Sequence, residues 1–150
     1  MAQIGLRGSA QARVDAQGRL KVPAHFRSVL LDQYGSDVYV TSLTGTFARV
    51  YPMSVWIVVE AKLAEMPPSH PSRQKFLDRT SYYGQVGEMD SQGRVLVPPT
   101  LRETAAISGA VRVFGQMNVL EVWNEELFGR RMADSPWTEE DALEVAKYGA

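Results

Sequence analysis

The chain has 150 residues, of which 45 % are hydrophobic and 22 % charged, and its formal net charge at pH 7 is −1. These values are ordinary for a soluble globular protein, and the length leaves room for one domain or two very small ones. The chain has no cysteine, no signal-peptide core and no apolar run near the roughly 20 residues that cross a bilayer, which excludes disulfides and membrane spans and predicts a cytoplasmic protein.

The first half of the chain predicts a helix and four strands. Asp15-Ala16-Gln17-Gly18 has the signature of a type I turn, with Asp in the first position and Gly in the fourth. Residues from Pro23 to Gly35 predict a helix, because proline suits its first position and glycine its end. Leu30 and Leu31 recur there at helical spacing with Phe26. Alternating or β-rich patterns predict strands at Gln11 to Val14, Arg19 to Val22, Asp37 to Thr41 and Phe47 to Tyr51.

The middle of the chain predicts two further helices. Residues from Ser54 to Met66 carry apolar side chains at helical spacing, Val58 among them, and Ser54 is a candidate N-cap. Pro67 and the prolines after it end this helix. A second helix is predicted from Ser72 to Tyr83.

The second half repeats the first. Residues 15 to 27 read D-A-Q-G-R-L-K-V-P-A-H-F-R and residues 90 to 102 read D-S-Q-G-R-V-L-V-P-P-T-L-R, with seven identical positions of thirteen. A helix starting at Pro98 follows, and Glu125 to Met132 predicts a last long helix. The acidic tail from Ala133 predicts a loosely ordered segment, apart from a last helical turn at Thr138 to Lys147. The strands predicted in this half are Gln85 to Met89, Arg94 to Val97, Val111 to Phe114 and Val119 to Trp123.

Neither half is long enough to bury an adequate core alone. We therefore expect the halves to interlock, each completing the sheet of the other, in one β-rich α+β unit with pseudo-twofold symmetry and helices outside. The expected organisation is a first repeat at residues 5–52, linking helices at 53–83, a second repeat at 84–127, and a C-terminal helix with an acidic tail at 128–150.

The sequence offers little for catalysis. His25 and His70 are the two histidines, and both are most simply surface residues. Motifs for nucleophilic serine, metal ligation and phosphate-binding loops do not occur, so we expect no enzyme, metal, cofactor or small-molecule substrate. A hydrolase that uses His25 or His70 stays open as an alternative.

The repeated D-x-x-G-R turn is the better functional candidate. Aspartate and glycine suit a turn anywhere, and the aspartate could pair with the arginine only to brace it. However, a turn does not require the arginine that follows it in both copies. An arginine fork matches phosphate oxygens and the guanine edge, and a two-stranded ribbon fits the DNA major groove. The residues that form this motif are Asp15, Gly18, Arg19, Asp90, Gly93 and Arg94.

Other motifs accompany the two turns in a fixed order between about residue 4 and residue 130. They are Arg7-Gly8, G-R-L-x-V-P-x-x-F-R from 18, Y-P-M-S-V-W at 51 to 56, G-E-M-D-S-Q-G-R-V-L-V-P at 87 to 98, F-G-Q-M-N at 114 to 118 and L-E-V-W at 120 to 123. Together with D-x-x-x-R in both copies, this set resembles the MraZ family of bacterial transcriptional regulators, built from two SpoVT/AbrB-like halves. Met1 to Gln3 and the acidic tail lie outside the pattern.

The resemblance implies a fold, a partner and an assembly. The fold is a swapped-hairpin AbrB-like double-repeat β-barrel with peripheral helices. The partner is double-stranded DNA, at short direct repeats upstream of the division and cell-wall gene cluster, where similar proteins regulate their own operon, commonly as repressors. The assembly is a ring-shaped homo-oligomer associated with the nucleoid, with its DNA-binding loops on one face.

The two copies differ in charge next to the turn. The first carries Arg13 and Lys21, whereas the matching positions in the second are Glu88 and Leu96. Because phosphate contacts dominate DNA affinity, we expect the first copy to make most of the contact. The predicted DNA-binding residues are therefore Arg19 first, then Arg94, with Arg13, Lys21 and Arg7. An antitoxin-like module that neutralises a partner protein remains the alternative.

Overall fold

The computed structural model describes residues 5–150, so the Met1 to Gln3 extension lies outside the described residues. Its strands are β1 (Leu6–Val14), β2 (Arg19–Lys21), β3 (Asp37–Thr41), β4 (Ala48–Pro52), β5 (Gln85–Glu88), β6 (Arg94–Leu96), β7 (Gly109–Met117) and β8 (Val119–Trp123). Its helices are α1 (Ala24–Gln33), α2 (Met53–Leu63), α3 (Pro71–Tyr82), α4 (Pro99–Thr104), α5 (Glu125–Asp134) and α6 (Glu139–Ala146).

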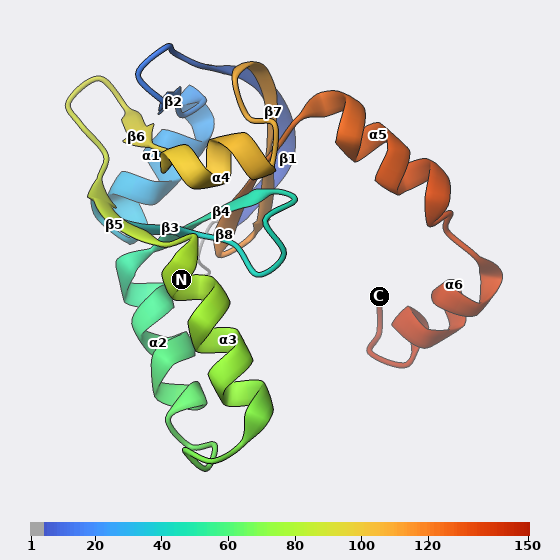
Figure 1. The fold of residues 1–150 in the computed structure, drawn as a ribbon. Helices are drawn as coiled ribbons and strands as arrows, with labels where there is room; N and C mark the ends of the chain where they lie inside the picture. Colours follow the sequence, from blue (N-terminus) through green and yellow to red (C-terminus); the bar gives the residue numbers. More distant parts are fainter. Residues whose placement is uncertain (1–4) are drawn as a thin grey trace.

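The strands form one antiparallel sheet in the order β5-β3-β4-β8-β7-β1-β2-β6, which curls into a nearly closed barrel. Figure 1 shows α2 and α3 projecting from the barrel as an antiparallel pair, and α5 and α6 leading away from it on another side. None of the helices formed by the described residues combines the length and apolar character that a bilayer crossing requires.

Each half of the chain completes its sheet with strands of the other half. The β3–β4 hairpin pairs with β5 on one side and β8 on the other. In the same way the β7–β8 hairpin reaches back to pair with β1. The strands that follow the two D-x-x-G-R turns, β2 and β6, pair with each other around Leu20 and Val95. The predicted α+β, swapped-hairpin, double-repeat barrel with peripheral helices is therefore confirmed.

Apolar side chains from both halves fill the barrel and form a single core. Phe26 and Leu30 of α1 and Leu101 of α4 are buried in this core, so the two short helices cover the barrel. Leu31 is exposed, contrary to the helical pattern, because a neighbour of Leu30 points about 100° away around the helix. Strand residues that contribute to the core include Val38, Val40, Val50, Val111, Val113, Leu120 and Val122.

Several boundaries differ from those predicted. Strand β1 begins at Leu6 rather than Gln11, because nine of its residues pair with β7. Pro52 occupies the N-cap position of α2, so Ser54 is not its cap. Val58 is 52 % exposed, because α2 packs only one face on the barrel. The turn predicted at Thr138 to Lys147 is a regular helix, α6, which lies between these two residues as its caps and begins with a reciprocal capping box of Thr138 and Asp141.

Candidate nucleic-acid interface

Loop 1 (residues 15–19) is a tight turn organised by one carboxylate. Asp15 Oδ1 accepts hydrogen bonds from the backbone N–H groups of Gln17 and Arg19, both at 2.9 Å. Its Oδ2 accepts from Arg19 Nε, also at 2.9 Å. The Gly18 N–H donates to the Asp15 carbonyl at 2.9 Å, and Gly18 has φ +86°, a conformation that glycine adopts without strain.

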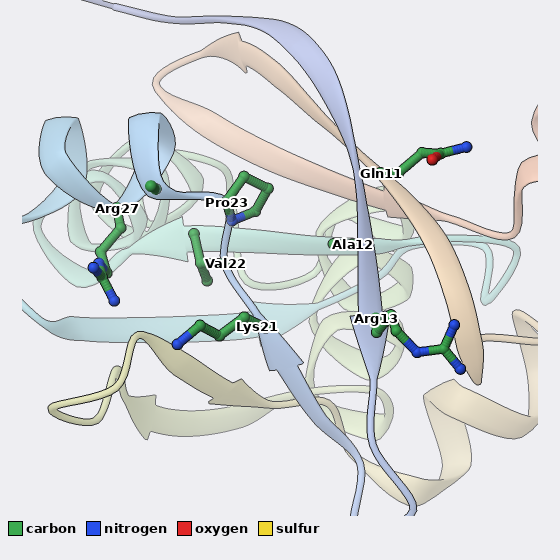
Figure 2. A pocket seen from close by; sticks show the side chains of 8 residues that line it. Gln11, Ala12, Arg13, Lys21, Val22, Pro23 and Arg27 are labelled. Atoms are coloured by element: carbon green, nitrogen blue, oxygen red, sulfur yellow. The ribbon is translucent and has the colours of Figure 1, made fainter.

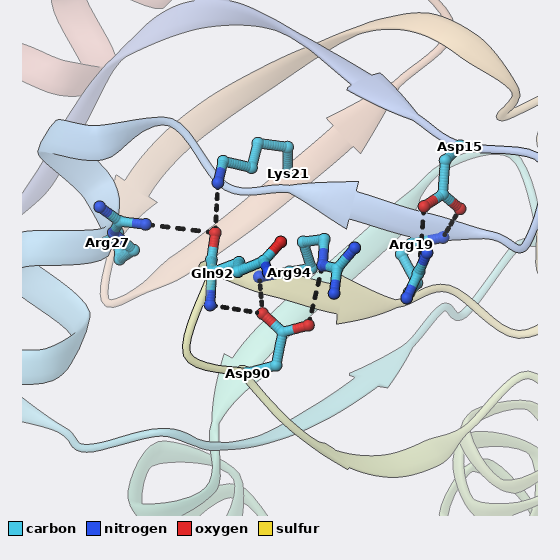
Figure 3. A network of polar contacts seen from close by, with 7 residues as sticks. All are labelled: Asp15, Arg19, Lys21, Arg27, Asp90, Gln92 and Arg94. Carbon is cyan, nitrogen blue, oxygen red and sulfur yellow. Dashed lines mark hydrogen bonds and ion pairs between the residues drawn. The ribbon is translucent and has the colours of Figure 1, made fainter.

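Loop 2 (residues 90–94) repeats this arrangement. Asp90 accepts from the N–H groups of Gln92 and Arg94 and from Arg94 Nε, each at 2.9 Å. Gly93 donates to the Asp90 carbonyl at 2.9 Å and has φ +77°. The sequence repeat is thus also a repeat in hydrogen bonding, and Figure 3 shows both loops with their ion pairs on the paired strands β2 and β6.

These bonds favour the charged form of both aspartates. The backbone N–H of Arg19 is the largest cause that lowers the pKa of Asp15, ahead of the arginine side chain. The backbone N–H of Arg94 likewise lowers the pKa of Asp90. Both carboxylates are therefore ionised at neutral pH and hold the arginines by charge-assisted bonds.

The two arginines stay accessible. The side chain of Arg19 is 36 % exposed and that of Arg94 is 26 % exposed. The aspartates engage only Nε, and within residues 5–150 no hydrogen bond occupies the terminal Nη groups of either arginine. Each loop therefore presents a guanidinium of fixed orientation with its outer donors available to a ligand.

Four of the five predicted DNA-binding side chains lie together. A surface hollow of about 500 Å³ is lined by Arg13, Arg19, Lys21 and Arg94 with the start of loop 1. Arg7 is separate, because it lies near the other end of β1, opposite Gln116 of β7.

A second hollow adjoins the first, and its lining includes the Arg27 side chain, which was not among the predicted DNA-binding residues. It measures about 490 Å³ and is lined by Arg13 and Lys21 with Arg27 of α1, over an apolar floor that includes Val22 and Pro23 (Figure 2). Lys21 Nζ donates to the Gln92 carbonyl of loop 2, and Arg27 Nη1 donates to the same oxygen at 3.2 Å. The signal for Arg27 was present in the sequence, since both thirteen-residue copies end in arginine.

The histidines do not form a catalytic arrangement. His25 is exposed and its ring contacts Phe26, with centroids 3.9 Å apart. His70 caps α3, because its Nδ1 accepts from the Ser72 N–H at 3.1 Å. Among the described residues no group of three His, Asp or Glu side chains is placed to hold a metal ion.

Comparisons with known proteins agree with this architecture. The family described as "MraZ protein, putative antitoxin-like" matches residues 6–79 and 85–142. The protein named Transcriptional regulator MraZ of Acidobacterium capsulatum is 49 % identical over 143 residues, which cover 95 % of this chain and 98 % of that protein. Its namesake of Koribacter versatilis is 46 % identical over 144 residues, with the same two coverages. A more distant one, of Halorhodospira halophila, is 36 % identical over 142 residues and covers 94 % and 92 %. The chain belongs to the MraZ family.

Proposed function

We propose that this chain regulates transcription by binding double-stranded DNA in a sequence-specific manner, with loops 1 and 2 contacting the duplex. Its relatives are named transcriptional regulators, which supports the coarse function. The observation that carries the DNA interface is the pair of oriented, accessible guanidinium groups of Arg19 and Arg94 on two adjacent strands.

The geometry of these strands suits the DNA major groove. Strands β2 and β6 are an antiparallel pair in which Lys21 lies opposite Arg94 and Arg19 opposite Leu96. A two-stranded ribbon of this kind can enter the groove, and an arginine there can bind guanine N7 and O6 through two donors. The aspartate bond to Nε reduces the rotamer freedom of each arginine before binding, which lowers the entropic cost of the contact.

The first repeat makes the larger contribution in this proposal. The first repeat supplies Arg13 and Lys21 to the hollow that Arg19 and Arg94 share, whereas Glu88 and Leu96 stand at the matching positions of the second repeat. Arg19 is also the more exposed of the two arginines. Affinity that depends on such phosphate contacts falls steeply with salt concentration.

The regulatory setting is also part of the proposal. The chain binds short direct repeats in its own promoter, upstream of the division and cell-wall gene cluster, and represses it. Several subunits of a ring-shaped homo-oligomer read adjacent repeats, so weak contacts of single subunits add through effective concentration. This places the protein in the cytoplasm at the nucleoid.

A binding titration with the promoter of the protein's own operon, at one fixed salt concentration, tests the interface. We expect Arg19→Ala to weaken specific binding by about tenfold to a hundredfold, since one bidentate base contact contributes on the order of 1–3 kcal/mol. Arg94→Ala should weaken it less. Arg130→Ala, which removes only an exposed ion pair with Glu126 on α5, is the matched control.

Equal losses for Arg19→Ala and Arg94→Ala would disprove the asymmetry between the repeats. If the unaltered chain binds the promoter and neither substitution weakens this binding, the DNA interface lies elsewhere on the protein. Repeating the titration at several salt concentrations distinguishes phosphate contacts from base contacts, because only the former change the slope of affinity against salt.

An antitoxin-like role is the second candidate. The description of the matching family includes this term. In addition, exposed apolar side chains, Leu143 on α6 and Trp137 just before this helix, lie close to its acidic first turn. A chain that neutralises a toxic nuclease should co-purify with it through residues 135–150. Unchanged DNA binding and no co-purified nuclease would argue against this role.

A further inference from the structure

Each loop is contacted by an arginine from the opposite half of the chain. Arg102 of α4 packs against Gly18 of loop 1, so closely that a Cβ at Gly18 would lie 2.5 Å from its Cζ and Nε atoms. Its Nε donates to the Val97 carbonyl at 3.0 Å. The Val97 N–H in turn donates to the Gly18 carbonyl at 2.8 Å, so Arg102 and loop 1 are joined through one peptide segment.

The equivalent contact, related by the pseudo-twofold symmetry of the repeats, is present at loop 2. Arg27 of α1 packs against Gly93, where a Cβ would lie 2.5 Å from its Cδ and 2.6 Å from its Nη1. Its Nη1 donates to the Gln92 carbonyl at 3.2 Å. The Val22 N–H donates to the Gly93 carbonyl at 2.9 Å. Figure 3 shows Arg27 and Lys21 reaching from the first repeat to the Gln92 carbonyl of loop 2.

We infer that Arg27 and Arg102 are positioning residues that act across the repeats: Arg102 sets the conformation of loop 1, and Arg27 that of loop 2. This inference rests on the proposed function, and it deepens it by naming the groups that orient Arg19 and Arg94 toward DNA. Neither positioning arginine needs to touch the nucleic acid itself.

The burial of the glycines supports this role. Asp15, Ala16 and Gln17 are exposed, yet Gly18 is buried. Gly93 is likewise buried after three exposed residues of loop 2. The glycine with positive φ is thus the point at which each loop is held from two sides. Its N–H donates to the carbonyl of the aspartate of its own turn, and the arginine of the other repeat packs against it. A loop held from both sides loses less conformational entropy when it binds.

The two clamps are unequal. The Gln92 carbonyl of loop 2 accepts from two cations of the first repeat, Lys21 and Arg27. Leu96 occupies the position that matches Lys21, so the second repeat has no amine to offer loop 1. The atoms nearest an added Cβ at Gly18 all belong to Arg102, so Arg102 is the substitution with the larger expected effect.

Amide hydrogen exchange in the free protein tests the positioning role without DNA. We expect Arg102→Ala to speed exchange of the Gly18 and Arg19 amides by about tenfold while leaving the Gly93 and Arg94 amides unchanged, because local opening is governed by local contacts. Arg27→Ala should do the reverse. Arg130→Ala is the control and should change neither loop. Effects confined to the loop of the same repeat, equal effects on both loops, or no effect would each overturn the inference.

Lysine variants separate packing from charge and protect the test against misfolding. Arg102→Lys and Arg27→Lys keep the positive charge but lack the planar guanidinium that lies on the glycine. We expect them to show the same crossed pattern of exchange as the alanine variants. Full rescue by lysine would show that charge alone acts on the loops and would overturn the packing argument.

A double-mutant cycle on promoter binding links positioning to DNA. Arg102→Ala should weaken binding by about tenfold alone and in the Arg94→Ala background, but by less than about threefold in the Arg19→Ala background, because coupled residues are not additive. Equal losses in both backgrounds would mean a general structural effect. If the unaltered chain does not bind the promoter, the proposed function fails, and the exchange experiment still decides whether the arginines set the loops.

Discussion

Asp15 and Asp90 each use both carboxylate oxygens to join a turn to an arginine side chain. The same atoms thus determine the backbone conformation and the direction of the guanidinium. This dual use explains why aspartate suits the position better than asparagine, whose amide offers only one oxygen and no charge. One aspartate in each loop therefore fixes both the turn and the orientation of the arginine that is proposed to bind DNA.

The pH dependence of stability follows from the lowered pKa of both aspartates. A carboxyl group with a lower pKa in the folded state stabilises the fold above its ordinary pKa of 3.8 and loses this contribution as the pH falls through the folded value. Asp15→Asn with Asp90→Asn should therefore lower the thermal midpoint at neutral pH. The difference from the unaltered chain should shrink on the acid side of 3.8, and parallel curves would contradict this.

The glycine of loop 1 is constrained by space as well as by φ. Gly18 and Gly35 have φ of +86° and +89°, but only Gly18 has an atom within 4 Å of an added Cβ. Both alanine substitutions should cost about 1–2 kcal/mol for the left-handed conformation. Gly18→Ala should cost more in urea unfolding, and the excess over Gly35→Ala should disappear in the Arg102→Ala background. Equal losses of unfolding free energy for the two alanine variants in the unaltered background would show that the Arg102 side chain moves aside without a measurable loss of stability.

At the scale of elements, the α2–α3 pair is attached to the barrel by aromatic stacking. The Trp56 ring lies 4.7 Å from that of Tyr39, 4.9 Å from that of Tyr51 and 6.2 Å from that of Phe76. The Thr80 carbonyl near the end of α3 accepts from the hydroxyl of Tyr39 at 2.9 Å. Tyr39 of strand β3 therefore contacts both helices: its ring stacks on Trp56 of α2, and its hydroxyl donates to the Thr80 carbonyl of α3.

Trp56→Ala should accordingly be strongly destabilising. The side chain is buried, and removal of a buried tryptophan costs about 3–5 kcal/mol. Val58→Ala on the exposed face of the same helix should change the unfolding free energy by no more than about 0.5 kcal/mol. Urea unfolding of both variants measures the contrast, and similar losses would mean that the outer face of α2 is covered in solution.

At the scale of the molecule, neither half has a complete sheet. Strands β3 and β4 have partners in β5 and β8, while β1 pairs with β7, so most long pairings cross between the halves. The core likewise mixes residues of both, such as Val40 and Val113. The barrel therefore forms as one cooperative unit.

A chain divided in the exposed turn between α2 and α3 tests this cooperativity. Fragments 1–68 and 69–150 should each lack a cooperative unfolding transition, because each exposes the sheet edges and apolar faces that the other covers. Mixed in equal amounts, they should recover the circular dichroism and a cooperative transition of the intact chain. A fragment that unfolds cooperatively by itself would show that the halves fold independently.

The sequence predicted local features well where short-range chemistry determines them. The D-x-x-G-R turns and the hairpin strands at Asp37 and Val119 formed as predicted, because turn residues and alternation act over a few positions. Features that depend on distant partners were missed or wrong. The start of β1 depends on its ladder with β7, and the exposed side of α2 at Val58 depends on which face the barrel covers.

The amino-acid sequence by itself determined that two copies of one turn-and-strand unit exist and that each carries an arginine after its aspartate. Local hydrogen bonding and backbone preference are sufficient for that. Only the tertiary structure decided that the two loops lie at opposite ends of the short ribbon formed by β2 and β6. It also decided that Arg13 and Lys21 join Arg19 while Arg7 does not, and that Arg27 and Arg102 each pack on the loop of the opposite repeat. Those relations arise from pairing between segments about 75 residues apart, which no local pattern encodes.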